Sequence, residues 1–445
     1  MTIRKILIRV FLSLLAVVAA VLVVRAVLNL IEGRKLERAL SDLKAQGIPL
    51  TIGEILAPCS EGDNGAALWK AAEDLYDFAG EDAGFFTQAY QNYVREVPMT
   101  PGMEAALTRL IERNRRVLDL IPEIAGKPCF RYEDADVRAW ERRMPNAPKM
   151  LRAVRLWCLE SIRIAERGDL AGAVDRLRTG LRFSPKIAEE PMLIAYLVAL
   201  AEVKDCLLAL NRALSGREAG GDLLLSVHGD LDDRLIEQWK ALFRNGIRSE
   251  AVQFLEIVRA PSAKTLASSW GIKSRPARLY FWLIRPLIKR DLRLRVPIYF
   301  ELEAQAVLPY YRTRDFWKRH GDWLEDLPWY AVLSKNMIPN IEAAVMKSAT
   351  FDALVLTARA GLACRIFKAR TGHYPETLEA LVPSLLTEVP VDPFTGDPLV
   401  YRREGNGFIV YSLGSNLRDD GGRSTWEITQ MVMDKDDDWT WREDQ

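Results

Sequence analysis

The sequence predicts a mainly α-helical protein with an N-terminal transmembrane helix, an irregular helical array and a small C-terminal α+β part with an antiparallel sheet. Three observations predict this fold class. A long apolar run lies near the N-terminus, helical patterns alternate with proline and glycine through the middle, and the C-terminal part becomes rich in turns. At 445 residues the chain is long enough for two or three units.

The composition is that of a folded globular chain, with 49% hydrophobic and 27% charged residues. The 61 basic and 60 acidic residues leave a formal net charge of +1. Proteins that bind nucleic acid usually carry an excess of basic residues. Because this chain has no such excess, we expect no nucleic-acid partner.

The N-terminal apolar run begins after Arg9. Residues 10–24 carry no charge, and read on through 26–31 the run reaches about 22 residues, or about 33 Å of helix, which is enough to span a bilayer. The alternative is a buried core helix of a soluble protein, but such helices rarely run this long without a polar face. The run therefore predicts a membrane helix, and the membrane is the first expected partner.

Basic residues on both sides of this run bear on its orientation. Arg4, Lys5 and Arg9 precede it, and no small-residue cleavage pattern closes it, which favours a retained signal anchor. Four basic residues follow and weaken the charge bias: Arg25, Arg34, Lys35 and Arg38. We expect residues 1–34 to form a cytoplasmic stub and a single-pass anchor in the inner membrane, with the bulk of the chain in the periplasm.

The region 35–340 is predicted to be the helical array. Its helical patterns cover 34–47, 66–78, 103–121, 148–167, 170–183, 191–214 and 231–258. Around Gly168 and Asp169 a helix end, a tight turn and a new apolar pattern predict a helical hairpin. The hairpin resembles a tetratricopeptide-type repeat at its turn, with Ala173 as the small residue where the helices approach. No second copy follows at a fixed period, so the array is either a surface for protein partners or a spacer.

The segment 273–295 interleaves basic residues with Tyr280, Phe281 and Trp282. Two interpretations are open: an interfacial membrane segment, or a buried aromatic helix with its bases on the solvent side. We favour the second. Pro276 and Pro286 are expected to prevent a long helix there, and the tryptophans that follow are expected to be packing residues: Trp317, Trp323 and Trp329.

The five cysteines show no CxxC pair. Cys158, Cys206 and Cys364 lie in helical patterns and are expected to pack as small hydrophobes. Cys59 and Cys129 each follow a proline in loop-like sequence. They either stay free or, if the body lies outside the inner membrane, pair as a disulfide.

The region 341–445 is predicted to form the α+β part. A helical pattern fills 341–370, and prolines and glycines then impose turns. Residues 399–401 and 408–412 are β-prone and flank a turn at 404–407, which predicts a hairpin lying on the helix. The residues expected between sheet and helix are Leu362, Ile366, Leu378, Leu381, Val400, Ile409 and Tyr411.

This region resembles the globular domain of the major pseudopilin of type II secretion systems. The matching residues are Thr371, Gly372, Tyr374, Pro375, Leu378, Leu381, Val382, Pro383, Pro390, Asp392, Pro393, Phe394, Gly396, Pro398, Tyr401, Phe408, Tyr411, Ser412 and Gly414. The chain departs from that family in lacking a pilin processing site before its apolar run and in placing the helical array between anchor and module. The resemblance therefore bears on fold more than on role.

The resemblance implies a calcium site after the second strand. Carried onto this sequence, the ligands would be the carbonyl of Leu413, the side chain of Asn416, and Asp419, Asp420 or members of the acidic cluster Asp434, Asp436, Asp437 and Asp438. Oxygen atoms of this kind are the ligands that calcium prefers. The alternative is a solvated turn followed by an acidic tail.

Motifs for catalysis are weak in this sequence. His228, His320 and His373 lack metal-ligand spacing, and the carboxylate pairs 232–233 and 301–303 are common in an acid-rich chain. We expect a non-catalytic envelope protein with protein partners. The alternatives are a component that assists a type II secretion or pilus-like system, and a hydrolase using carboxylates in a helical groove.

Overall fold

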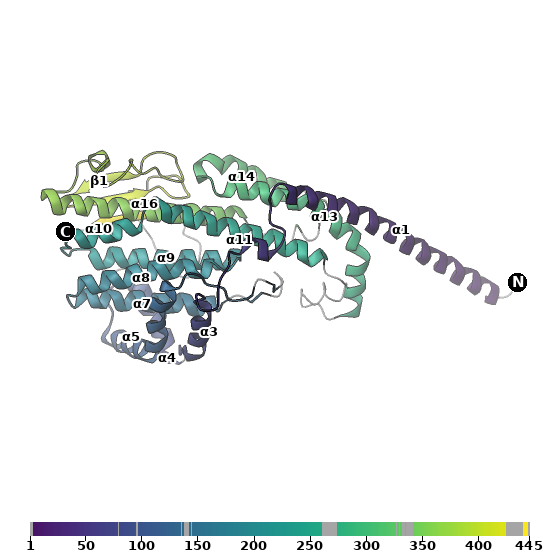
Figure 1. The fold of residues 1–445 in the computed structure, drawn as a ribbon, viewed down its shortest axis with the longest axis horizontal. Helices are drawn as coiled ribbons and strands as arrows, with labels where there is room; N and C mark the ends of the chain where they lie inside the picture. The colour runs from purple at the N-terminus through teal and green to yellow at the C-terminus, as the bar shows by residue number, and fades with distance from the viewer. Residues whose placement is uncertain are drawn as a thin grey trace.

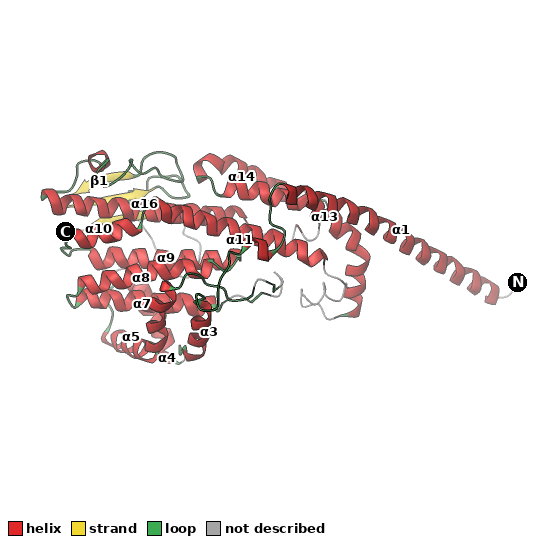
Figure 2. Ribbon diagram, viewed as in Figure 1, coloured by secondary structure: helices red, strands yellow, loops and turns green. Residues whose placement is uncertain are grey.

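The computed structural model describes residues 3–78, 80–94, 97–134, 136–137, 142–143, 145–259, 274–325, 327–328, 330–331, 334, 341–423 and 439–443. Within these residues the chain is mainly helical, with one three-stranded antiparallel sheet near the C-terminus (Figure 1, Figure 2). The predicted fold class agrees with this architecture at the level of its helices, its apolar N-terminal helix and its small sheet.

The helices occupy the following ranges: α1 Ile3–Ala45, α2 Ile52–Ile55, α3 Ala66–Leu75, α4 Glu81–Val94, α5 Pro101–Arg113, α6 Arg115–Gly126, α7 Ala147–Glu166, α8 Leu170–Ala188, α9 Leu193–Leu214, α10 Gly221–Asp230, α11 Asp233–Arg259, α13 Arg275–Ala306, α14 Tyr310–Glu325 and α16 Ile341–Thr371. A short 3-10 helix, η1, covers Leu378–Leu381, and the strands are β1 Val400–Glu404, β2 Gly407–Ser412 and β3 Trp439–Glu443.

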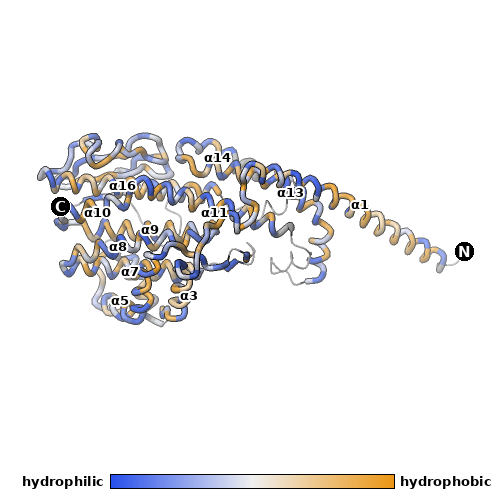
Figure 3. Tube along the Cα trace, in the orientation of Figure 1, coloured by the Kyte–Doolittle hydropathy of each residue, from blue (hydrophilic) through white to orange (hydrophobic). Residues whose placement is uncertain are grey.

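Helix α1 is one continuous rod with two different halves. Its apolar half extends away from the rest of the molecule and ends at the free N-terminus (Figure 1, Figure 3). The helix is long and apolar enough to cross a membrane, and its apolar window buries nothing against the protein. Its last turns are different, because Leu36, Leu40 and Leu43 are buried in the core at helical spacing.

The predicted hairpin at Gly168 and Asp169 is confirmed as the α7–α8 junction. Gly168 has a φ of +96°, a left-handed conformation that glycine adopts without steric cost. The Asp169 side chain caps α8 by accepting from the Gly172 amide at 2.8 Å. Ala173 is fully buried where the two helices approach.

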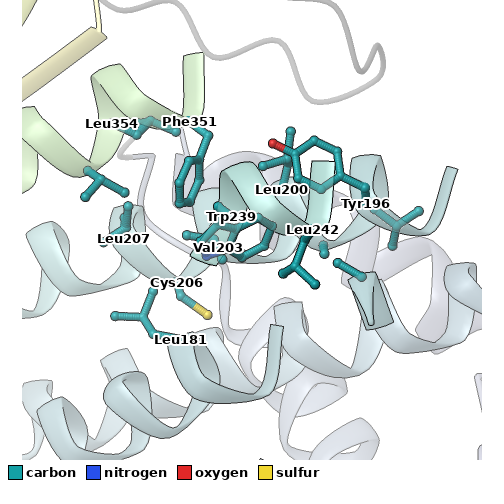
Figure 4. Close-up of a cluster of buried hydrophobic side chains, with 14 of the residues drawn as sticks. Leu181, Tyr196, Leu200, Val203, Cys206, Leu207, Trp239, Leu242, Phe351 and Leu354 are labelled. Atoms are coloured by element: carbon teal, nitrogen blue, oxygen red, sulfur yellow. The ribbon is translucent and has the colours of Figure 1, made fainter. Parts of the chain in front are cut away.

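The core of the array joins α9, α11 and α16. Tyr196 stacks on Phe243, and Trp239 packs against Phe351 with ring centres 4.6 Å apart. Figure 4 shows Tyr196, Trp239 and Phe351 among aliphatic side chains such as Leu207 and Leu354. The buried cluster is continuous from the end of α1 to β3. The division at residue 341 into two domains stays a prediction.

The prediction of a single helix over residues 103–121 was wrong. Residues 103–121 form parts of two helices, α5 and α6, divided at Asn114. The buried Asn114 side chain accepts a hydrogen bond from the Asp77 amide and donates to the Asp77 and Leu110 carbonyls. These bonds hold the residue between α5 and α6 against Asp77.

The prediction that prolines prevent a long helix in 273–295 was also wrong. Pro276 lies at the start of α13, where its missing N–H costs nothing, and Pro286 and Pro297 lie inside the helix. Ile288 and Leu292 are buried as α13 packs along α1 and α11. This packing offsets the hydrogen bonds that the internal prolines remove.

The predicted hairpin is confirmed as β1 and β2, with Glu404 paired to Gly407 and Val400 to Tyr411. The residues expected between helix and sheet are buried, except Val400, which is half-buried. Strand β3 was not predicted. It pairs with β2 on the other side, and its Trp441 packs on α16.

Long-range contacts fasten the sheet to the array. Arg365 of α16 forms a buried ion pair with Glu443 of β3 and donates to the Arg217 carbonyl at 2.6 Å. The Tyr311 amide of α14 donates to the Pro393 carbonyl at 3.0 Å. These contacts attach the C-terminal part to the array.

The alternatives for the cysteines are decided by the structure. Cys59 and Cys129 form a disulfide, and Cys158, Cys206 and Cys364 are buried free thiols. Trp317 is fully buried as expected, whereas the side chains of Trp323 and Trp329 lie outside the described residues.

Candidate functional site

The candidate site is the loop 413–423 that follows β2. The buried residue Asp392 holds the start of this loop in place. Its carboxylate accepts hydrogen bonds from the Ser412 hydroxyl at 2.9 Å and from the Leu413 amide at 2.8 Å. Burial raises the pKa of Asp392, while the donors around it, including the Phe394 amide, favour the charged form. Asp392 thus ties the DPFTG turn to the start of the loop.

Asn416 and Asp420 are brought together by the loop. The Asn416 amide nitrogen donates to Asp420 Oδ2 at 2.7 Å, and Asn416 Oδ1 accepts from the Arg418 amide at 2.9 Å. Arg423 lies 4.0 Å from the same carboxylate. Two of the predicted ligands, Asn416 and Asp420, are therefore hydrogen-bonded to each other.

Asp419 has a different set of partners. Its Oδ1 accepts from the Tyr411 hydroxyl at 2.8 Å and from the Gly421 amide at 2.9 Å. Arg402 donates to that same hydroxyl and to the Gly421 carbonyl. This chain of hydrogen bonds fixes the loop against the hairpin.

The loop backbone is tightly wound. Leu417 has a φ of +60°, an uncommon conformation for a branched side chain, and Gly422 also has a positive φ. A Cβ on Gly422 would overlap the side chain of Ile409, so the loop lies closely over the sheet.

Asn416 and Asp420 carry oxygens of the kind that calcium takes, but the Asn416 amide nitrogen, and not its oxygen, faces the Asp420 carboxylate. With the Leu413 carbonyl these residues would supply only part of the six to eight oxygens that calcium takes. Asp434, Asp436, Asp437 and Asp438 lie outside the described residues. Within the described ranges, no group of three or more His, Cys, Asp or Glu side chains is arranged to hold a metal.

Other described residues singled out for chemistry take part in ion pairs or lie beside an arginine. Glu303 pairs with Arg244 and Arg248, and Asp233 pairs with Arg359. Burial lowers the pKa of His228 to about 4, with Arg359 adding repulsion. Glu303 and Asp233 are therefore held in ion pairs, and His228 is a half-buried imidazole.

Sequence reasoning missed Glu202, which lies fully buried on α9. Its carboxylate oxygens have no hydrogen-bond partner among the described residues, and burial raises its pKa well above the ordinary value. Its neighbour Asp205 is different, because it binds Arg155 at 2.9 Å and accepts from the Tyr90 hydroxyl. The available signal was an acidic residue inside the apolar run LIAYLVALAEV.

Comparisons of the chain with protein-family models, with curated proteins and with solved structures found no match.

Proposed function

We propose that the chain is a non-catalytic, membrane-anchored protein of the cell envelope. In this proposal α1 crosses the inner membrane, the helical array is a rigid periplasmic scaffold, and the C-terminal part is a pseudopilin-like cap that contacts protein partners.

The observation that carries the proposal is the division of α1 into an exposed apolar half and a buried half. From Ile6 to Ile31 the large apolar side chains are exposed, which a water-soluble protein would not sustain. From Glu32 onward the same helix enters the core. The anchor is therefore continuous with the body, and a body held in this way stands at a fixed distance from the bilayer.

The disulfide supports the placement of the body on the periplasmic side of the membrane. Cys59 and Cys129 pair across 70 residues of sequence, and such bonds persist in oxidising compartments. A periplasmic body provides that environment. It also agrees with the expectation of an N-terminus inside.

The position of the cap supports a role in contacting partners. The sheet and its loop lie at the end of the molecule opposite the apolar half of α1 (Figure 1). In the proposed orientation this end is the part furthest from the membrane. Calcium bound by Asn416, Asp420 and the Leu413 carbonyl would stiffen the loop 413–423 on that end.

Two measurements in cells test the proposal. Sodium carbonate extraction should leave the full chain in the membrane pellet. Alkaline phosphatase fused after Gln445 should be active, and green fluorescent protein fused at the same place should be dark. Release by carbonate would overturn the anchor, and a fluorescent fusion would overturn the orientation.

A further inference from the structure

The first turns of α13 lie against α1 at Arg25, which follows the uncharged stretch 10–24. Arg25 Nε donates to the Trp282 carbonyl at 2.9 Å, and the Arg25 guanidinium lies 3.4 Å from the centre of the Trp282 ring. Further along, Lys289 Nζ donates to the Asn29 carbonyl at 3.3 Å. These contacts fix residues 275–285, here called the arm, beside Arg25, the first charged residue of α1 after the uncharged stretch 10–24.

The arm runs across the direction of α1. Figure 1 shows α13 bending, so that its first turns extend sideways from α1 and the remainder continues along the body. Pro286 follows directly after the arm, and internal prolines are the usual cause of such bends. If α1 crosses a bilayer, the arm lies along the bilayer surface.

The arm has an exposed apolar face. Leu279, Tyr280 and Leu283 are 58%, 51% and 39% exposed, and their spacing places them on one side of the helix. Phe281, on the opposite side of the arm, is buried. The arm is thus apolar on two sides, and the described protein covers only one of them.

A third side of the arm is basic. Arg275, Arg278 and Arg285 recur at intervals of three and seven residues and so share a face. Arg285 and Lys289 lie close enough to Arg25 to repel it, and Glu37 lies near Lys289. Positive charge therefore gathers at the level where the phosphates of a bilayer would lie.

We propose that the arm is an interfacial helix that inserts Leu279, Tyr280 and Leu283 into the surface of an anionic phospholipid bilayer and binds the lipid phosphates through its arginines. The proposal rests on the proposed function, since α1 supplies the membrane. Amphipathic helices with this combination of apolar and basic faces lie at the boundary of headgroups and acyl chains. With two attachments, α1 and the arm, the body would be fixed in rotation as well as in distance.

Nitroxide labels on the full chain test this. Single cysteines are placed at Val18, Leu283 and Leu294, with the native disulfide intact and the buried thiols Cys158, Cys206 and Cys364 unreactive. Leu283 and Leu294 lie on the same helix and are both 39% exposed, so they form a matched pair. Leu294 lies about 16 Å further along the helix. The protein is reconstituted in vesicles of phosphatidylcholine with phosphatidylglycerol, and label depth is measured from relaxation by oxygen and by a water-soluble nickel complex.

The Leu283 label is expected about 5–10 Å below the headgroup level, the Val18 label deeper, and the Leu294 label in water. A Leu283 label as accessible to nickel as Leu294, with Val18 deep, would overturn the interfacial arm and leave the anchor intact. Such a result would point to a protein partner for the exposed face. A Val18 label in water would overturn the anchor and the arm together.

The contribution of the arginines to binding of the arm is tested by changing the charge of the lipid. In vesicles of phosphatidylcholine alone, the Leu283 label is expected to lie nearer the water than in anionic vesicles. Equal depth in both lipids would overturn the phosphate contacts. The combined change Leu279→Gln and Tyr280→Gln should likewise bring the Leu283 label toward water.

Discussion

Gly361 of α16 lies directly under the indole ring of Trp441 in β3. A Cβ at Gly361 would overlap the ring atoms, so the absence of a side chain permits the close approach of helix and strand. Trp441 is 3% exposed at this contact. Together with the Arg365–Glu443 ion pair, this contact fastens the last strand to the scaffold.

Gly361→Ala is expected to lower the free energy of unfolding by about 1–3 kcal/mol, because overpacking displaces the indole. Urea denaturation of the purified full chain, followed by circular dichroism, measures this. Gly229→Ala in α10 is the control, since a Cβ there meets open space and should stabilise the helix by about 0.4–1 kcal/mol. If the free energy of unfolding changed in the same direction in both variants, the close contact between Gly361 and Trp441 would be contradicted.

Replacing Cys59 and Cys129 with serine is expected to lower the free energy of unfolding by about 2–4 kcal/mol, because the bond closes a long loop in the unfolded chain. Thermal melts with and without reductant measure the effect. Reductant should lower the melting temperature of the wild type and leave that of the double variant unchanged. A wild type insensitive to reductant would refute the stabilising role.

Glu202→Gln is expected to alter the pH dependence of stability. The raised pKa keeps the folded carboxyl protonated where the unfolded one, with its ordinary pKa of 4.5, has ionised. The folded state then binds the extra proton, and stability falls as pH rises above 4.5, by on the order of 1.4 kcal/mol per pH unit, until the folded group ionises.

The glutamine variant should therefore gain stability relative to the wild type on going from pH 5 to pH 7.5, as measured by urea denaturation. The exposed Glu218→Gln serves as the control and should follow the wild type at both values. If the Glu202→Gln difference is the same at pH 5 and pH 7.5, burial does not hold the proton on Glu202.

Calcium is expected to raise the melting temperature of the wild type and to have no effect on Asp420→Ala. A ligand that binds only the folded state stabilises it by about 2.7 kcal/mol at one hundred times its Kd. The control is Glu388→Ala, an exposed acid of the same part of the chain outside the loop. A response of Asp420→Ala equal to that of the control would exclude this carboxylate as a ligand.

Local signals in the sequence were enough to predict α16, the β1–β2 hairpin and the α7–α8 turn. Each is specified by residues close together along the chain, such as Gly168 with Asp169. The apolar half of α1 is equally local, because its length and composition predict it directly.

The features that escaped prediction depend on partners far along the chain. Strand β3 is only five residues long, and its place is set by Gly361 and Arg365, some 80 positions earlier by residue number. Helix α13 continues through Pro286 because α1 packs beside it. In the candidate site, the sequence named Asn416, Asp419 and Asp420, but the hydrogen bond that the Tyr411 hydroxyl donates to Asp419 required the folded hairpin.

The oxidation state of the cysteines in intact cells tests most directly whether α1 holds the body outside the cytoplasm. Cells are quenched in acid, the protein is denatured, and free thiols are counted by a mass-shifting maleimide. Three of the five cysteines should react before reduction, since Cys59 and Cys129 are paired, and all five afterwards. Five reactive thiols before reduction would place the body in a reducing compartment and contradict the proposed topology.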